Sequence, residues 1–284
     1  MQTGTVITMS IKLITFDLDG TFLADDKSIP EKNIQALKYA YEKGVYVVPA
    51  TGRHFNALPE SIRSLPYIRY FILINGARVY DAQEDRTLST CYMPNSTALA
   101  LFENARPLHC SFDCYVDDRG YMDLALFNRL EEFIADPYYL AYVRSVRNPV
   151  EDLSAFVIER GCDIQKVQYY FNPQYLHERS EQLETLPVKF PGVRATSSVP
   201  GNIEINAADA GKGPALETLC SLLGFGVEDT IAFGDGTNDI DILQTAGMGI
   251  SPSNAVPEVL EIADMITSSN NDAGVAEAIF KLLG

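Results

Sequence analysis

The chain has 284 residues, enough for one large domain or two smaller ones, and a globular composition with 46% hydrophobic and 21% charged residues. Its 38 acidic and 22 basic side chains give a formal net charge of −16. This charge disfavours binding to nucleic acid or to an anionic membrane surface, because both need clustered Lys and Arg. Apolar runs such as Tyr70 to Ile74 have only the length of a strand, so the sequence predicts no membrane-spanning segment. The N-terminus lacks a basic n-region, a long apolar h-region and a cleavage site, so no secretory signal is expected.

Five cysteines, an odd number, are scattered along the chain. This pattern predicts reduced thiols and a cytoplasmic location. His109, Cys110 and Cys114 are close in sequence, but no second pair follows at zinc-finger spacing, and we interpret them as strand residues. Met9 directly precedes the first expected strand, and we expect residues 1–8 to be a dispensable extension.

The first 80 residues alternate between strand and helix. Apolar runs at residues 11–17, 45–48 and 70–75 predict three buried strands. Ser28 and Glu31 have the spacing of a capping box at the start of a helix. Strands separated by helices predict parallel pairing, with helices on both faces of the sheet.

The middle of the chain, from about residue 81 to residue 200, has a less regular pattern. Hairpins are expected near residues 118–120 and 190–192. Amphipathic helices are expected near three segments, 96–104, 128–135 and 173–184. This mixture is typical of an α+β domain inserted into an α/β domain.

The last third returns to alternating strands and helices. The predicted strands are 230–234 and 248–251, and the predicted helices are 213–223, 239–245, 255–263 and 272–283. The two ends of the chain therefore predict one α/β domain made of residues 1–81 and 201–284. The insert is assigned to residues 82–200.

Asp17 and Asp19 stand where the first strand ends, in the run Phe16-Asp17-Leu18-Asp19-Gly20-Thr21. Ligands of open parallel sheets bind beyond the carboxyl ends of the strands. Two acids separated by one residue point to the same side of an extended chain. The pattern indicates a nucleophilic carboxylate, Asp17, beside an acid that exchanges protons with a leaving group, Asp19. A solvated Asp-Gly turn is the alternative interpretation.

Thr51, Gly52 and Arg53 follow the second strand. A hydroxyl, backbone N–H groups and a guanidinium at this junction suit an oxyanion, although an N-cap threonine beside a surface arginine has the same pattern. Lys212 lies between two glycines at the start of a helix, which leaves room for a ligand. Taken alone, one lysine at a helix start is a weak signal.

Asp235, Asn238 and Asp239 follow another apolar strand. Two carboxylates and an amide offer hard oxygen ligands, which favour Mg²⁺ over softer metals. The alternative is a polar turn in which Asp239 stabilises the first turn of a helix. An EF-hand is excluded, because the acids do not alternate and no glutamate closes a 12-residue loop.

The order of these sites, acid pair, Thr-Gly-Arg, Lys and acid pair, resembles the haloacid dehalogenase superfamily of phosphatases. More closely, the chain is similar to the Cof-type branch, subfamily IIB, whose members carry a large C2-type cap between the second and third motifs. Asn75-Gly76-Ala77 and Asn270 to Ala276 also look like family features, although Ala273 separates Asp272 from the glycine that the acid usually precedes. The resemblance implies a Rossmann-like parallel-sheet core, and for the insert it predicts only position and size.

The resemblance also implies roles for the motif residues. Asp17 would attack phosphorus to form an aspartyl-phosphate, and Asp19 would protonate the leaving alcohol and then deprotonate water. Mg²⁺ would be held by the Asp17 carboxylate, the Asp19 main-chain carbonyl and Asp235, with Asp239 orienting a bound water or completing the shell. The residues expected to bind the phosphoryl group are Thr51, Gly52, Arg53, Lys212 and Asn238.

These features together predict a Mg²⁺-dependent phosphatase for small phosphomonoesters, such as sugar phosphates or phosphorylated cofactors, acting as a monomer or homodimer. A phosphomutase is the alternative enzyme, and a non-catalytic binding domain would be expected to lack Asp17 or Asp19. The cap is expected to close over the site and to choose the leaving group. The segment Asp117 to Tyr121 either reaches the site or forms a surface hairpin.

Overall fold

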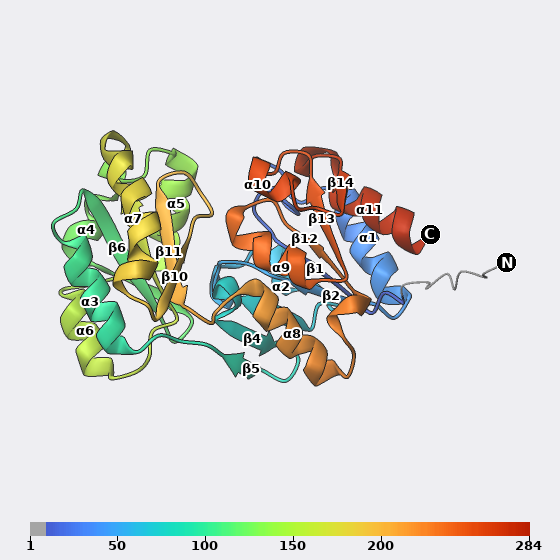
Figure 1. Cartoon of the computed structure of the whole chain (residues 1–284), viewed down its shortest axis with the longest axis horizontal. Helices are drawn as coiled ribbons and strands as arrows, with labels where there is room; N and C mark the ends of the chain where they lie inside the picture. Colours follow the sequence, from blue (N-terminus) through green and yellow to red (C-terminus); the bar gives the residue numbers. More distant parts are fainter. Residues whose placement is uncertain (1–9) are drawn as a thin grey trace.

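The computed structural model describes residues 10–284, so the expectation for residues 1–8 lies outside the described residues. Figure 1 shows two lobes, the core on the right and the cap on the left, each built around its own sheet. Between residues 10 and 284, no helix is both long and apolar enough to cross a membrane.

The core lobe contains a five-stranded sheet in the order β14-β13-β12-β1-β2, in which all neighbouring strands are parallel. The parallel sheet that the strand and helix alternation predicts is therefore confirmed. β14 is a short strand that the sequence pattern did not indicate. The strands are β1 (Leu13–Phe16), β2 (Tyr46–Pro49), β12 (Thr230–Phe233), β13 (Met248–Pro252) and β14 (Met265–Thr267).

Helices cover both faces of this sheet, because successive strand residues point to opposite sides. Ile14 and Phe16 of β1 pack in one cluster with α1 and α11, whereas Leu13 packs in a second cluster with α8 and α9. The core helices are α1 (Glu31–Glu42), α2 (Glu60–Arg63), α8 (Lys212–Leu223), α9 (Ile240–Thr245), α10 (Pro257–Leu260) and α11 (Gly274–Leu283).

The start of α1 differs from the prediction. Its N-cap is Pro30, and no side chain caps the helix, so the capping box expected for Ser28 and Glu31 is wrong. The Ser28 hydroxyl donates instead to the carboxylate of Asp26, a local partner that the spacing rule ignores.

A three-stranded antiparallel sheet adjoins the core sheet, with strands β3 (Tyr70–Leu73), β4 (Arg78–Asp81) and β5 (Arg86–Thr90). β3 meets the end of β2 through one parallel bridge, Ala50 to Ile72, but its ladder is formed with β4. The third predicted strand therefore belongs mainly to an antiparallel sheet, because the chain after it turns back at once.

The cap lobe contains a six-stranded sheet in the order β10-β11-β9-β6-β7-β8, antiparallel except between β7 and β8. Its strands are β6 (Cys110–Val116), β7 (Arg119–Asp123), β8 (Arg147–Val150), β9 (Lys166–Phe171), β10 (Val193–Thr196) and β11 (Asn202–Ala207). β5 pairs with β4, next to the core sheet, whereas β11 pairs with β9 and β10 in the cap sheet. The domain bounds, residues 1–81 and 201–284 for the core and 82–200 for the insert, stay predictions.

The cap helices are α3 (Asn95–Ala105), α4 (Leu124–Phe127), α5 (Pro137–Val146), α6 (Leu153–Arg160) and α7 (Leu176–Lys189). The helices expected at 96–104 and 173–184 and the hairpin at 118–120 are present. The α-helix expected at 128–135 is wrong, because this segment holds only a short 3-10 turn, Leu130–Glu132, and the next α-helix, α5, begins after Asp136, whose side chain caps it. The segment 190–192 joins α7 to β10 and is not a hairpin.

The cap sheet has one polar and one apolar face. Along β9, Lys166, Gln168 and Tyr170 alternate with apolar or aromatic neighbours, as they must on opposite sides of a strand. The register places Gln168 between Asp113 of β6 and Glu204 of β11. The other face packs against α3, α6 and α7. The buried polar face is therefore available to the core lobe.

Candidate active site

Three carboxylates meet at the carboxyl edge of the core sheet. Asp17 follows β1, whereas Asp235 and Asp239 lie in the loop and turn after β12, and one oxygen of each lies within 4.8 Å of the others. Thr21 donates to Asp235 Oδ1 at 2.6 Å, and Asp239 Oδ2 accepts the backbone N–H groups of Asp235 and Gly236. Neighbouring parallel strands end at one edge, which is why these distant residues meet.

Lys212, the first residue of α8, joins two of these acids. Its side chain is buried, and Nζ donates to Asp17 Oδ1 and to Asp239 Oδ1, both at 2.6 Å. The start of α8 approaches Gly76 so closely that a Cβ there would lie 1.9 Å from the Gly211 carbonyl oxygen. Gly76 also has a φ of +85°, which only glycine adopts without strain, so both the close approach and the backbone conformation require glycine here.

The cluster carries more negative than positive charge. Burial raises the pKa of Asp17 well above its ordinary value, and Lys212 offsets only part of that effect. Burial, followed by the neighbouring Asp239, raises the pKa of Asp235 to about 7. The cluster contains three carboxylates and one ammonium group. The carboxylates offer hard oxygen ligands, and their excess negative charge would be neutralised by a divalent cation, so this donor set fits such an ion.

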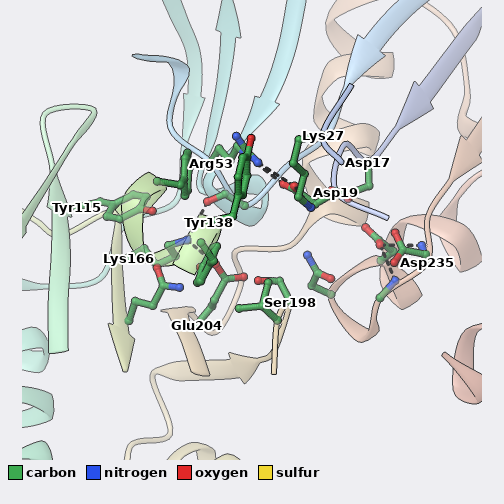
Figure 2. Close-up of a pocket in the computed structure, with 18 of the residues that line it drawn as sticks. Asp17, Asp19, Lys27, Arg53, Tyr115, Tyr138, Lys166, Ser198, Glu204 and Asp235 are labelled. Atoms are coloured by element: carbon green, nitrogen blue, oxygen red, sulfur yellow. Dashed lines mark hydrogen bonds and ion pairs between the residues drawn. The ribbon is translucent and has the colours of Figure 1, made fainter. Parts of the chain in front are cut away.

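Asp19 turns away from this cluster. Its carboxylate accepts from Arg53 Nε and Nη2 at 2.9 and 2.8 Å and from Lys27 Nζ at 3.0 Å (Figure 2). Burial alone would raise the pKa of Asp19, but Arg53 and Lys27 outweigh it, and the pKa is lowered. Arg53 also lies over the ring of Tyr142 from the cap, 4.5 Å from its centroid, so it contacts both lobes.

The remaining predicted residues lie around the same pocket. Thr51 follows β2, is buried, and accepts the backbone N–H of Arg53 at 3.3 Å. The Gly52 carbonyl accepts from Lys166 of the cap at 2.8 Å, and Asn238 donates to Asn75 at 3.3 Å. The predicted residues that line the pocket directly are Asp17, Asp19, Gly52, Arg53, Asp235, Asn238 and Asp239.

Residues 14–279 match the family model of the haloacid dehalogenase-like hydrolases. The chain belongs to this family. A uracil-derivative phosphatase of Bacillus subtilis, 5-amino-6-(5-phospho-D-ribitylamino)uracil phosphatase YcsE, is 32% identical over 275 residues, 95% of each chain. The pyridoxal phosphate phosphatase YbhA of Escherichia coli is 27% identical, over 97% of this chain and 100% of the relative.

A solved haloacid dehalogenase-like hydrolase from B. subtilis superposes with a TM-score of 0.80 at 26% identity, covering 95% of this chain and 99% of that one. As a haloacid dehalogenase-like hydrolase with named phosphatases among its relatives, the chain is a phosphatase. The family resemblance drawn from the motif order is thereby confirmed, and with it the α/β core that carries an α+β insert.

The hydrolase pocket also has a cap side that the motifs did not predict. Lys166 donates to Glu204 Oε1 at 2.6 Å, and Asn75 donates to Glu204 Oε2 at 2.9 Å. The sequence did carry one signal for this side of the pocket: polar residues alternate with apolar or aromatic ones along β9, which indicates a polar face of the sheet. The pocket residues missed from the sequence are Lys27, Tyr115, Tyr138, Tyr139, Tyr142, Arg147, Lys166, Gln168, Ser198, Val199, Glu204 and Gly236.

The cap segment Asp117 to Tyr121, considered from the sequence, does not line the pocket. Asp118, at the turn between β6 and β7, forms an ion pair with Arg78 of the core at 3.0 Å. Asp117 pairs with Arg160 on the surface, and Tyr121 is buried against an aromatic neighbour. The segment is therefore a hairpin that touches the core, while α5 and β9 of the cap line the site.

Proposed function

We propose that this phosphatase hydrolyses small phosphomonoesters through a covalent intermediate on Asp17. The observation that carries this proposal is the position of the Asp17 carboxylate, 2.6 Å from the ammonium group of Lys212 and at the wall of a pocket shared by both lobes. Lys212 orients the carboxylate and offsets charge as a phosphate approaches. The names of YcsE and YbhA, a phosphoribitylamino-uracil and a pyridoxal phosphate phosphatase, support small phosphorylated metabolites as the substrate class.

The acid cluster is the proposed Mg²⁺ site. The Asp17 carboxylate, Asp235 and the main-chain carbonyl of Asp19 would hold the ion, and Asp239 would support the shell from its bonds to Lys212 and to backbone N–H groups. Bound Mg²⁺ would neutralise charge between the carboxylates and polarise a phosphoryl oxygen. This assignment accounts for the excess of carboxylates over cations.

The chemistry proposed for the protein's own residues has two steps. Asp17 attacks phosphorus, the bond to the alcohol oxygen breaks, and water then hydrolyses the aspartyl-phosphate. Asp19 gives a proton to the leaving oxygen and later takes one from the water. Because Arg53 and Lys27 favour the anionic form of Asp19, they assist the second of these proton transfers. The residues that would bind the phosphoryl oxygens are Thr51, Gly52, Arg53, Lys212 and Asn238.

Phosphate release from p-nitrophenyl phosphate tests the proposal. Asp17→Asn should abolish turnover, and EDTA should do so reversibly, with activity returning on addition of Mg²⁺. Full activity of Asp17→Asn would exclude Asp17 as the nucleophile. An isomeric sugar phosphate without inorganic phosphate would indicate the phosphomutase instead. The cytoplasmic location and the monomer or homodimer state stay predictions.

A further inference from the structure

A second cavity, here called the annex, adjoins the acid-lined pocket. It lies between the region of α5 in the cap and the core loop that carries Lys27. Lys27, Tyr138, Tyr139 and Val199 line both spaces, so the two cavities are direct neighbours. The apolar side chains that line the annex alone include Phe133, Ile134, Pro173, Leu176 and Pro200.

The two spaces differ greatly in size. The pocket at the acids has a volume of about 80 Å³, whereas the annex has a volume of about 780 Å³. If Asp17 receives the phosphoryl group, a leaving group of more than a few atoms finds room in the annex. The annex is therefore placed to act as the site for the rest of the substrate.

The walls of the annex favour an apolar ring. Tyr138 and Tyr139 contribute aromatic rings to the lining that the annex shares with the pocket, and further aromatic and aliphatic side chains line the rest. Burying an apolar ring against such walls removes apolar surface from water. The charged residues that line the annex are Asp25, Asp26 and Asp136 and one cation, Lys27, so a negatively charged leaving group is repelled.

The polar face of the cap sheet gives no excess positive charge to oppose this preference. Arg147 Nε donates to Asp113 at 2.7 Å, and Lys166 donates to Glu204 at 2.6 Å. Each of these cations already has its own carboxylate. Arg147 Nη1 has no hydrogen-bond partner among the described residues, but the charge of Arg147 is balanced by Asp113 and that of Lys166 by Glu204, so neither cation adds an unbalanced positive charge.

We propose that the preferred substrate is a phosphomonoester whose leaving group carries an uncharged, planar ring that occupies the annex. This inference rests on the proposed function, because the annex is assigned to the leaving group only if Asp17 receives the phosphoryl group. The observation that supports the inference is that Tyr138 and Tyr139 line both the acid-lined pocket and the annex.

Three alkyl phosphates of similar leaving-group acidity test it: 2-phenylethyl phosphate, ethyl phosphate and 2-(4-carboxyphenyl)ethyl phosphate, each with Mg²⁺. We expect kcat/KM for the phenylethyl ester to exceed that for the ethyl ester about tenfold or more. The carboxylated ester should lose most of this gain. Equal values for the first two esters would overturn the inference and leave the proposed function standing. Phosphate release from none of them would overturn both.

Variants locate the effect. Tyr138→Ala removes an exposed ring at the junction, and Leu176→Glu places a charge in the annex at a partly exposed helix start. Both should reduce the ratio of kcat/KM between the phenylethyl and ethyl esters. Tyr41→Ala is the matched control, since Tyr41 is an exposed tyrosine of α1 in the core, and it should leave this ratio unchanged. An unchanged ratio in both annex variants would overturn the placement of the ring.

Discussion

Charged side chains are buried in both lobes, but their balance differs. In the core, Asp17, Asp235 and Asp239 lie together beside one cation, Lys212, which binds Asp17 and Asp239. In the cap, Arg147 with Asp113 and Lys166 with Glu204 form two matched ion pairs. An unmatched cluster is unfavourable until it binds a cation, whereas matched pairs need no ligand. The difference separates a site arranged for chemistry from a polar surface that shapes the pocket.

The largest expected effect concerns the core cluster. Asp17→Asn should reduce phosphate release about a thousandfold or more, because a neutral amide cannot act as the nucleophile. The same change should stabilise the metal-free protein, because the raised pKa of Asp17 shows that its charged form is disfavoured by burial. Thermal unfolding with EDTA measures this second effect. If Asp17→Asn lowered both activity and stability, the core cluster would not be an unfavourable, unmatched one, and the contrast with the matched cap ion pairs would be wrong.

Removing one partner of a buried cap ion pair should destabilise the protein, in contrast to removing Asp17 from the core cluster. Arg147→Met leaves Asp113 buried without its cation and should destabilise the protein by about 3–5 kcal/mol, measured by urea denaturation. The double variant Arg147→Met with Asp113→Leu should recover much of this loss. Arg160→Met is the control, because Arg160 pairs with Asp117 on the surface, where such pairs contribute about 1 kcal/mol or less. Equal effects of Arg147→Met and Arg160→Met would contradict the structural role.

The response to pH and Mg²⁺ should come from the core cluster. The pKa of Asp235 rises from 3.8 to about 7 on folding, so its contribution to stability is complete below pH 3.8 and is lost as the pH rises through about 7. The metal-free protein should therefore unfold at a lower temperature at about pH 8.5 than at about pH 6.5. Mg²⁺ should raise the unfolding temperature more at the higher pH. Asp235→Asn should abolish most of this difference, and a pH-independent effect of Mg²⁺ would contradict the assignment.

The smallest expected effect concerns Arg53, which joins the two regions by binding Asp19 and lying over Tyr142. Arg53→Lys keeps the charge but loses the two-pronged contact with the carboxylate. We expect kcat/KM for p-nitrophenyl phosphate to fall about two- to tenfold, with little change in the melting temperature. An unchanged kcat/KM would show that this link between the lobes has no part in turnover.

Much of the core site could be predicted from local sequence. Asp17, Thr51 and Asp235 each follow an apolar run, and the strand and helix alternation already implied that these strands are parallel. Parallel neighbours end at the same edge, so spacing alone was enough to bring the motifs together. The local rules failed where a nearby side chain competed, as Asp26 does for the hydroxyl of Ser28 at the start of α1.

The cap side of the pocket was decided by tertiary structure. Glu204 lies outside the predicted insert, yet β11 pairs with β9 and brings it to Lys166. The position of Tyr142 over Arg53 depends on how α5 sits against the core, which no spacing along the chain records. The sequence by itself determined the family, the parallel core and the residues at the strand ends. Only the folded chain determined the partners of Asp19 and the walls of the annex, because these contacts depend on packing between segments far apart in sequence.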